Sequence, residues 1–248
     1  MISQGYVSKS LGFPWLNRYR LRKYNNKREP CVFFGCYQSG VDVKRILQHE
    51  GFALVVWGGT DALSTPKASY EKLKAPNIKH IAISNYLVNT LTKNGLMPYH
   101  FPIVATKPIA DPVKLGKCVY TYIDPRRPDF YGMPIIKELK RRVKFPFIIG
   151  YRKGNTKEWA YKAYRSSFIG LRLTKHDGLS NTVVEMGLFG RRCVWNGNIP
   201  SSIGWTDINE IVEHINRERE ITNPRKVAYD TAKYIDIGDE WLKLSTYK

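Results

Sequence analysis

The chain has 248 residues, of which 43% are hydrophobic, enough to fill the core of one large domain or two small ones. Its apolar runs are too short to cross a bilayer, residues 1–12 lack the apolar core of a signal peptide, and the four cysteines are scattered. We therefore predict a cytoplasmic protein with free thiols. The net charge of +19 favours polyanionic partners: nucleic acid, an anionic membrane surface or nucleotide phosphates.

Residues 1–30 form the most basic segment and read as an N-terminal arm. Basic and aromatic side chains alternate there, namely Arg18, Arg20, Arg22, Lys23, Lys27 and Arg28 with Trp15, Tyr19 and Tyr24. Such interleaving is typical of a segment that binds nucleic acid or lies peripherally on the inner face of a membrane. The alternative, which we prefer, is a solvated arm whose aromatic rings pack on the domain.

Residues 31–100 predict an N-terminal Rossmann-like domain with three or four strands. Apolar runs at 31–34, 52–57 and 80–84 predict strands, and the patterns at 41–50 and 85–94 predict helices. Gly35 follows the first strand, and Gly58, Gly59 and Asp61 follow the second. These glycines do not form a dinucleotide-binding fingerprint. The loop with Asp61 is either a ligand-facing loop or a tight turn closed by the aspartate.

A proline-rich linker at 101–116 separates this domain from a second one at 117–222, and 223–248 reads as a helical tail. In the second domain we expect strands at 117–123, 145–150 and 168–173 and another from residue 193. Helices are expected at 134–144, 159–165 and 205–220. Strands and helices therefore alternate on both sides of one linker, which predicts an α/β protein with parallel sheets.

The segment 168–194 reads as strand, polar loop, helix and strand. Asp177 and Gly178 mark the turn, a helix begins near Ser180 to Thr182, and Gly190 ends it. In such units ligands lie at the carboxyl ends of the strands, and the free N–H groups of the helix N-terminus favour phosphate. Two alternatives remain open: the turn is an ordinary one, and Thr182 with Glu185 forms a capping box.

Asp177 and Glu185 flank seven residues, and this segment resembles the acidic pair of retaining nucleotide-sugar glycosyltransferases of the GT-B type, especially family 4. The first acid there is usually Glu, so Asp177 is a departure. The resemblance is good over 117–215 and weak over 31–100. It implies two Rossmann-like domains that face a cleft, a reduced N-terminal half, and a tail that crosses back to the first domain.

The resemblance also implies roles for single residues. Asp177 would contact the donor sugar, Glu185 the ribose, and the loop Gly178, Leu179, Ser180 and Asn181 the diphosphate. Arg172 and His176 beside Asp177 are the other catalytic candidates, although Arg172 also suits a partner acid and a loop histidine is often solvated. Further basic candidates for the diphosphate are Arg126, Arg127, Arg152 and Lys175. On the acceptor side of the cleft would lie Gly35, Gly58, Gly59 and Asp61.

The function that the resemblance implies is transfer of a sugar from a nucleoside-diphosphate sugar with retention of configuration. No cofactor is expected, and because the sequence has no Asp-x-Asp triplet we expect no metal. The acceptor stays open among a glycan, a lipid, a protein and DNA. The alternative is a nucleic-acid-binding protein on a Rossmann-like scaffold, which would bind DNA or RNA in a salt-sensitive way and ignore nucleotide sugars.

Overall fold

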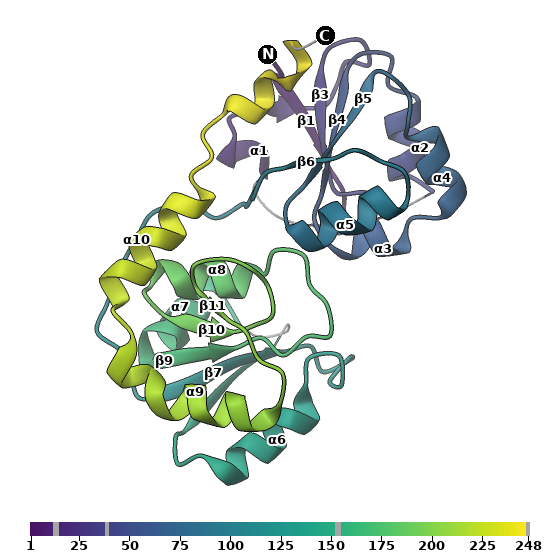
Figure 1. The fold of residues 1–248 in the computed structure, drawn as a ribbon. Coiled ribbons are helices and arrows are strands. Elements are labelled where there is room, and N and C mark those ends of the chain that lie inside the picture. Colours follow the sequence, from purple (N-terminus) through teal and green to yellow (C-terminus); the bar gives the residue numbers. More distant parts are fainter. Residues whose placement is uncertain (12–14, 38–39, 152–154, 247–248) are drawn as a thin grey trace. The chain divides into compact units, whose positions relative to one another are not determined.

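The chain folds into two compact units, which we describe from a computed structural model that covers residues 1–11, 15–37, 40–151 and 155–246. The N-terminal unit comprises Met1–Lys107, Asp177–Leu179 and Ile237–Lys248, and the C-terminal unit comprises Pro108–His176 and Ser180–Asp236. Each unit is a parallel sheet with helices packed on it (Figure 1). The predicted α/β class with two Rossmann-like domains is confirmed. No helix in the described part of the chain is long and apolar enough to span a membrane.

The N-terminal sheet has six parallel strands in the order β2-β1-β3-β4-β5-β6. The strands are β1 (Gln4–Val7), β2 (Arg22–Lys23), β3 (Cys31–Phe34), β4 (Ala53–Trp57), β5 (Ile78–Ala82) and β6 (Tyr99–His100). The helices are α1 (Trp15–Arg18), α2 (Asp42–Leu47), α3 (Thr60–Ser64), α4 (Lys67–Lys72) and α5 (Asn85–Lys93). Every residue of β3 and β4 is buried, as expected of apolar runs in a parallel sheet.

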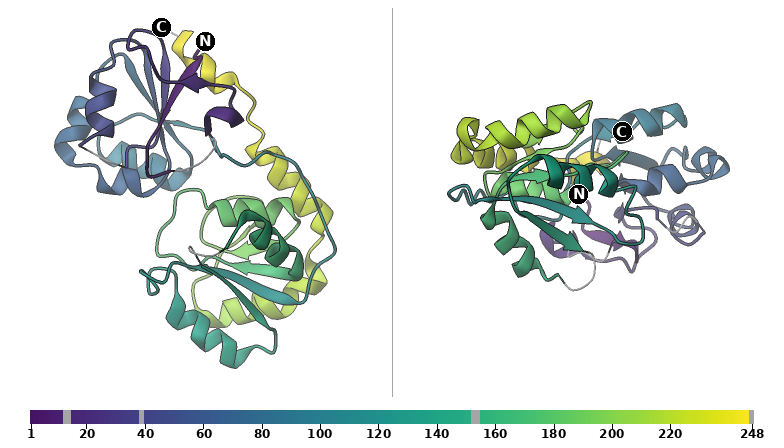
Figure 2. Two further views of the ribbon diagram at one scale, coloured as in Figure 1. Left: turned by 180° about the vertical axis from the view of Figure 1, so that it is seen from behind. Right: turned by 90° about the horizontal axis from the view of Figure 1, so that it is seen from below.

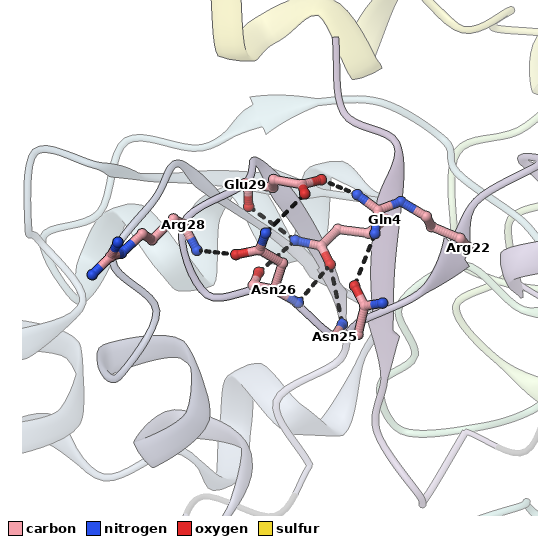
Figure 3. A network of polar contacts seen from close by, with 6 residues as sticks. All are labelled: Gln4, Arg22, Asn25, Asn26, Arg28 and Glu29. Atoms are coloured by element: carbon pink, nitrogen blue, oxygen red, sulfur yellow. Dashed lines mark hydrogen bonds and ion pairs between the residues drawn. The ribbon is translucent and has the colours of Figure 1, made fainter.

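The prediction of a basic arm over residues 1–30 is wrong. Strand β1 lies between β2 and β3 and pairs with β3 along its whole length, from Gln4 opposite Cys31 to Val7 opposite Phe34. The buried side chain of Gln4 donates to the carbonyls of Asn26 (2.7 Å) and Glu29 (3.0 Å), which ties the basic segment to the sheet (Figure 3). The predicted three or four strands therefore become six, and the N-terminal half is less reduced than the sequence indicates.

Both ends of the described chain lie on the N-terminal unit (Figures 1 and 2). The backbone N–H of Ile2 donates to the carbonyl of Leu242 in the 3-10 helix η1 (Glu240–Thr246). Trp241 of η1 is fully buried and meets the ring of Tyr19 edge-on, with centroids 5.0 Å apart. Residues 237–248 are thus part of the first unit, although nearly the whole second unit separates them from it in the sequence.

The C-terminal sheet has five parallel strands in the order β11-β10-β9-β7-β8. They are β7 (Cys118–Ile123), β8 (Phe147–Tyr151), β9 (Ser167–Leu171), β10 (Arg192–Val194) and β11 (Ser202–Ile203). Helices α6 (Met133–Arg142) and α9 (Ile208–Ile221) cover one face, where Ile136, Leu139, Ile211 and Ile215 fill the core (Figure 1). Helices α7 (Lys157–Ser166) and α8 (Asn181–Leu188) lie on the other face (Figures 1 and 2).

The predicted end of the second domain at residue 222 is wrong, because α10 (Pro224–Ile235) also belongs to the C-terminal unit. This helix packs on α8 at Gly187, where an added Cβ would stand 2.6 Å from the Thr231 hydroxyl oxygen. The approach of two helices at a glycine cannot be recognised from the composition of either helix. The first change of unit falls at 107/108, inside the predicted linker.

Arg191 joins the end of this linker to the C-terminal sheet. Its guanidinium is fully buried and donates to the main-chain carbonyls of Tyr164 (3.0 Å), Ser167 (3.0 Å), Val113 (2.8 Å), Lys114 (2.7 Å), Arg165 (3.0 Å) and Phe189. These carbonyls belong to the linker, the end of α7, the start of β9 and the end of α8. A single buried side chain thereby joins the main chain of the linker, α7, β9 and the end of α8.

Candidate functional site

The candidate site lies where β9 ends and α8 begins. Ser180 is the residue before α8, in an extended conformation (φ −71°, ψ 116°), and its side chain does not cap the helix. Its hydroxyl is buried and has no hydrogen-bond partner among the described residues. Buried polar groups are almost always paired, and leaving one unpaired costs about 1–3 kcal/mol. A ligand atom at the N-terminus of α8 would supply the missing partner.

Two further unpaired atoms occur at the same edge of the C-terminal sheet. The Thr174 hydroxyl follows β9, the Asn155 amide nitrogen follows β8, and neither has a partner within the described residues. Both segments follow the carboxyl ends of parallel strands, the edge at which α/β proteins bind ligands. The helix dipole and the free N–H groups of the first turn of α8 favour an anion at this edge.

Glu185 lies on the second turn of α8 with 15% of its side chain exposed. The Tyr164 hydroxyl donates to its Oε2 (3.3 Å), and the Lys157 ammonium lies 3.8 Å from its Oε1. The capping-box alternative is wrong, because the cap position is Ser180 and Thr182 already lies inside the helix. Asn181 precedes Glu185 by four residues, so both stand on one face of α8.

Three of the candidate side chains, Arg127, Arg172 and His176, gather on one aromatic cluster, which consists of Tyr122, Phe130 and Tyr131. The Arg172 guanidinium lies over the rings of Tyr131 (4.9 Å) and Tyr122 (5.7 Å). Arg127 stacks on Phe130 (4.1 Å), and the His176 ring meets the same phenyl ring edge-on at 4.9 Å. These contacts bring the loop after β7 and the loop after β9 together and restrict where the Arg172 charge can point.

The remaining basic candidates do not join this cluster in the same way. Arg126 forms a two-pronged ion pair with the buried carboxylate of Asp124, through Nε (3.0 Å) and Nη2 (2.7 Å). That pairing raises the pKa of Arg126 and offsets its charge. Lys175 is exposed, and Arg152 lies outside the described residues.

The loop Gly178 to Asn181 begins with a local contact, in which the N–H of Gly178 donates to the Asp177 carboxylate (3.0 Å). Asp177 to Leu179 group with the N-terminal unit, whereas Ser180 and Asn181 belong to the C-terminal one. This contact joins adjacent residues and is not the contact two residues on that defines an aspartate turn.

On the N-terminal unit, Asp61 has the contacts of the turn that the sequence left as an alternative. Its fully buried carboxylate accepts the N–H groups of Gly59 (2.7 Å), Ala62 (3.0 Å), Gly58 (3.1 Å) and Cys36 (3.2 Å). Burial raises the pKa of this carboxyl, and the four N–H groups oppose that shift. Gly35 and Gly59 have φ of 78° and 151°, which favour glycine. Asp61 therefore holds the loops after β3 and β4 in place.

Sequence reasoning missed Tyr164, Lys157, Asn155 and Thr174. Tyr164 and Lys157 lie on α7 and reach Glu185 only through packing of α7 beside α8, so no local pattern marks them. The described residues contain no group of three His, Cys, Asp or Glu side chains placed to hold a metal ion.

No family model and no curated protein matches the chain. Solved structures resemble its fold, among them TarM (TM-score 0.57, 13% identity, 90% of this chain and 55% of that one). Others are sucrose-phosphate synthase from Thermosynechococcus elongatus (0.60, 12%, 88% and 71%) and the pneumococcal O-GlcNAc transferase GtfA in complex with UDP and GlcNAc (0.56, 13%, 89% and 57%). The chain thus spans just over half of the length of TarM and GtfA. These neighbours are glycosyltransferases of the GT-B type, so the predicted GT-B fold is confirmed.

Proposed function

We propose that this protein is a glycosyltransferase that takes a sugar from a nucleoside-diphosphate sugar. The observation that carries the proposal is the buried, unpartnered Ser180 hydroxyl at the N-terminus of α8, on the ligand-binding edge of a parallel sheet. Two solved neighbours with this fold, a TarM variant and GtfA, are complexes with UDP. The sugar nucleotide is a substrate, and we propose no resident cofactor.

In this proposal the diphosphate binds the N–H groups of the first turn of α8 and the Ser180 hydroxyl. The ribose then lies along the helix face that Asn181 and Glu185 share, so that the Glu185 carboxylate accepts the ribose hydroxyls. Negative charge grows on the diphosphate as the glycosidic bond stretches, and the α8 dipole and the Arg172 guanidinium stabilise it. Because these groups offset the charge, we propose that turnover needs no divalent metal.

Asp177 precedes the residues assigned to the diphosphate, and we propose that it positions the donor sugar. A nucleophile would have to approach the anomeric carbon from the face opposite the leaving phosphate, whereas Asp177 is on the same loop as the phosphate-binding residues. We therefore propose retention of configuration without a covalent sugar on Asp177. The anomer of the sugar released or transferred, read by NMR at early times, tests this point, and an inverted product would contradict it.

Nucleotide binding tests the proposal directly. UDP, GDP and ADP should each be titrated by calorimetry and by thermal shift, because a ligand that binds only the folded state raises its stability. We expect Glu185→Gln and Ser180→Ala to weaken the tightest of them by about 1–3 kcal/mol, the usual cost of a lost buried or charged hydrogen bond. Ser166→Ala, on the exposed end of α7, is the control and should bind as wild type does. The proposal fails if wild type binds none of the three.

A further inference from the structure

The buried Tyr164 contacts Glu185, whose carboxylate binds the ribose in the proposed function. Tyr164 lies on α7 with a 3% exposed side chain, and its hydroxyl donates to Glu185 Oε2 at 3.3 Å. On the other side, the Lys157 ammonium lies 3.8 Å from Oε1 and 5.4 Å from the centre of the Tyr161 ring. The two oxygens of Glu185 therefore each meet a residue of the same helix, and these two residues lie about two turns apart.

The surroundings of Tyr164 fix the direction of its hydroxyl. The ring meets Tyr120 of β7 edge-on (5.0 Å between centroids, 88°) and packs against Phe189 after α8 (6.1 Å). Its main-chain carbonyl accepts a hydrogen bond from the buried Arg191. A ring held on two sides, with its backbone fixed as well, has little rotamer freedom left to lose when a ligand binds.

Tyr120 is held in turn by the neighbouring strand. Gly150 of β8 lies beside its hydroxyl, where an added Cβ would stand 2.4 Å from the Tyr120 oxygen. A glycine is therefore needed at this point of β8 for the tyrosine to keep its place. The support of Glu185 thus runs from the sheet through Tyr120 to Tyr164.

The protonation state of the Tyr164 hydroxyl also suits a hydrogen-bond donor. Burial raises its pKa well above the ordinary value, and the negative charge of Glu185 raises it further. The phenol therefore stays protonated at physiological pH and donates to the carboxylate. An ionised carboxylate accepts hydrogen bonds on both oxygens, so two adjacent ligand hydroxyls can each donate to one of them.

We propose that Tyr164 is a positioning residue that orients Glu185 to accept both hydroxyls of a ribose, so that the site selects ribonucleoside diphosphates over their deoxy counterparts. The inference rests on the proposed function and adds to it a residue that determines whether the site prefers ribose over deoxyribose. Tyr164 does not touch the ligand in this proposal and acts through Glu185 alone.

The experiment compares each nucleotide with its own 2′,3′-dideoxy form. The tightest binder among UDP, GDP and ADP is titrated by calorimetry against wild type, Tyr164→Phe, Glu185→Gln and Tyr229→Phe. The last variant is the matched control, because it removes the same hydroxyl from a 65% exposed ring on α10. We expect wild type and the control to prefer the ribonucleotide by about tenfold or more. That is the effect of one well-placed hydrogen bond to a charged group.

For Tyr164→Phe we expect this preference to shrink about fivefold, through weaker binding of the ribonucleotide with unchanged binding of the dideoxy form. Equal weakening of both ligands would mean that Tyr164 only supports the fold, and an unchanged preference would mean that it does not orient Glu185. Either result overturns this inference and leaves the proposed function standing. If wild type binds no nucleoside diphosphate at all, the proposed function itself fails and the inference falls with it.

Discussion

Arg126 and Arg172 are arginines at the same edge of the C-terminal sheet, yet their surroundings give them different electrostatic roles. The charge of Arg126 is matched by Asp124, whose side chain is only 5% exposed. Arg172 instead lies over two tyrosine rings, which orient the guanidinium. Of the two, Arg172 is the one that we propose to act on a bound diphosphate.

We expect Arg172→Met to weaken binding of the tightest nucleoside diphosphate by about 10- to 100-fold, the range for a lost charged hydrogen bond. The control is the double substitution Asp124→Asn with Arg126→Met, which removes a neutral pair and leaves the net charge unchanged. It should change binding less than about threefold. Calorimetry at two salt concentrations measures both effects, and an equal loss in the two proteins would contradict the assignment.

At the level of single residues the sequence predicted the strand, loop and helix around the candidate site and missed what long-range packing decides. The local pattern predicted Ser180 near the start of the helix and Glu185 inside it, which is where they lie, whereas their roles come from the resemblance and stay predictions. The pairing of Arg126 with Asp124 is also local, since only Pro125 lies between them, but no sequence pattern indicates which of several nearby basic side chains an acid pairs with. Tyr164 and Lys157 depend on how α7 packs beside α8, which no spacing records.

Among the elements, strands with continuous apolar runs were predicted and short polar strands were missed. The runs at β3, β4 and β9 are fully buried, the run at β7 is mostly buried, and all four were predicted to within a few residues. Strand β1 has the sequence Gln-Gly-Tyr-Val, which contains no apolar run, and it precedes a strongly basic segment. For this reason the sequence predicted an arm there instead of a strand. It becomes a strand because β3 offers it a parallel edge and Gln4 finds main-chain partners at Asn26 and Glu29, just before β3.

His80 of β5 links three elements of the N-terminal unit and should make its stability depend on pH. The indole N–H of Trp57 donates to His80 Nδ1 (3.2 Å), so Nε2 carries the proton and donates to the carbonyl of Leu73 (3.0 Å). Burial lowers the pKa of His80 to about 4. The unfolded chain therefore binds more protons than the folded one between that value and an ordinary histidine pKa of about 6.5.

The stability that His80 contributes is complete above pH about 6.5 and is lost as the pH falls toward its folded pKa. We expect the free energy of unfolding to drop by about 2 kcal/mol more in wild type than in His80→Gln between pH 7 and pH 5. Urea titrations at the two pH values measure the difference. The variant is essential, because the raised pKa of Asp61 acts in the opposite direction and is present in both proteins. Parallel pH profiles would contradict the prediction.

At the scale of the whole molecule, the basic surplus is not confined to one segment. Residues 1–110 carry 15 basic and 5 acidic side chains, and residues 111–248 carry 25 and 16. With β1 and β2 built into the sheet, this charge belongs to both folded units rather than to a separate arm. Positive charge that is distributed over both units attracts anionic partners in general and does not identify the acceptor.

A second feature of the whole molecule is that the end of the chain returns to the N-terminal unit. Trp241 is fully buried against Tyr19 and Phe34, with ring centroids 5.0 Å and 6.2 Å apart. A residue near the end of the sequence therefore completes a core whose other members lie near its beginning. Removing it should destabilise the N-terminal unit, even though the C-terminal unit is its closer neighbour along the chain.

We expect Trp241→Ala to lower the stability of the N-terminal unit by about 3–5 kcal/mol, the cost of emptying a buried tryptophan site. Lys243→Ala, in the same 3-10 helix with a 41% exposed side chain, should change it by less than about 0.5 kcal/mol. Hydrogen exchange separates the units: amides of β1, β3 and β4 should lose protection in Trp241→Ala, while those of β7 and β9 keep theirs. Equal losses in both sheets would mean that the two units unfold together, and unchanged exchange in β3 would mean that Trp241 is not part of the N-terminal core.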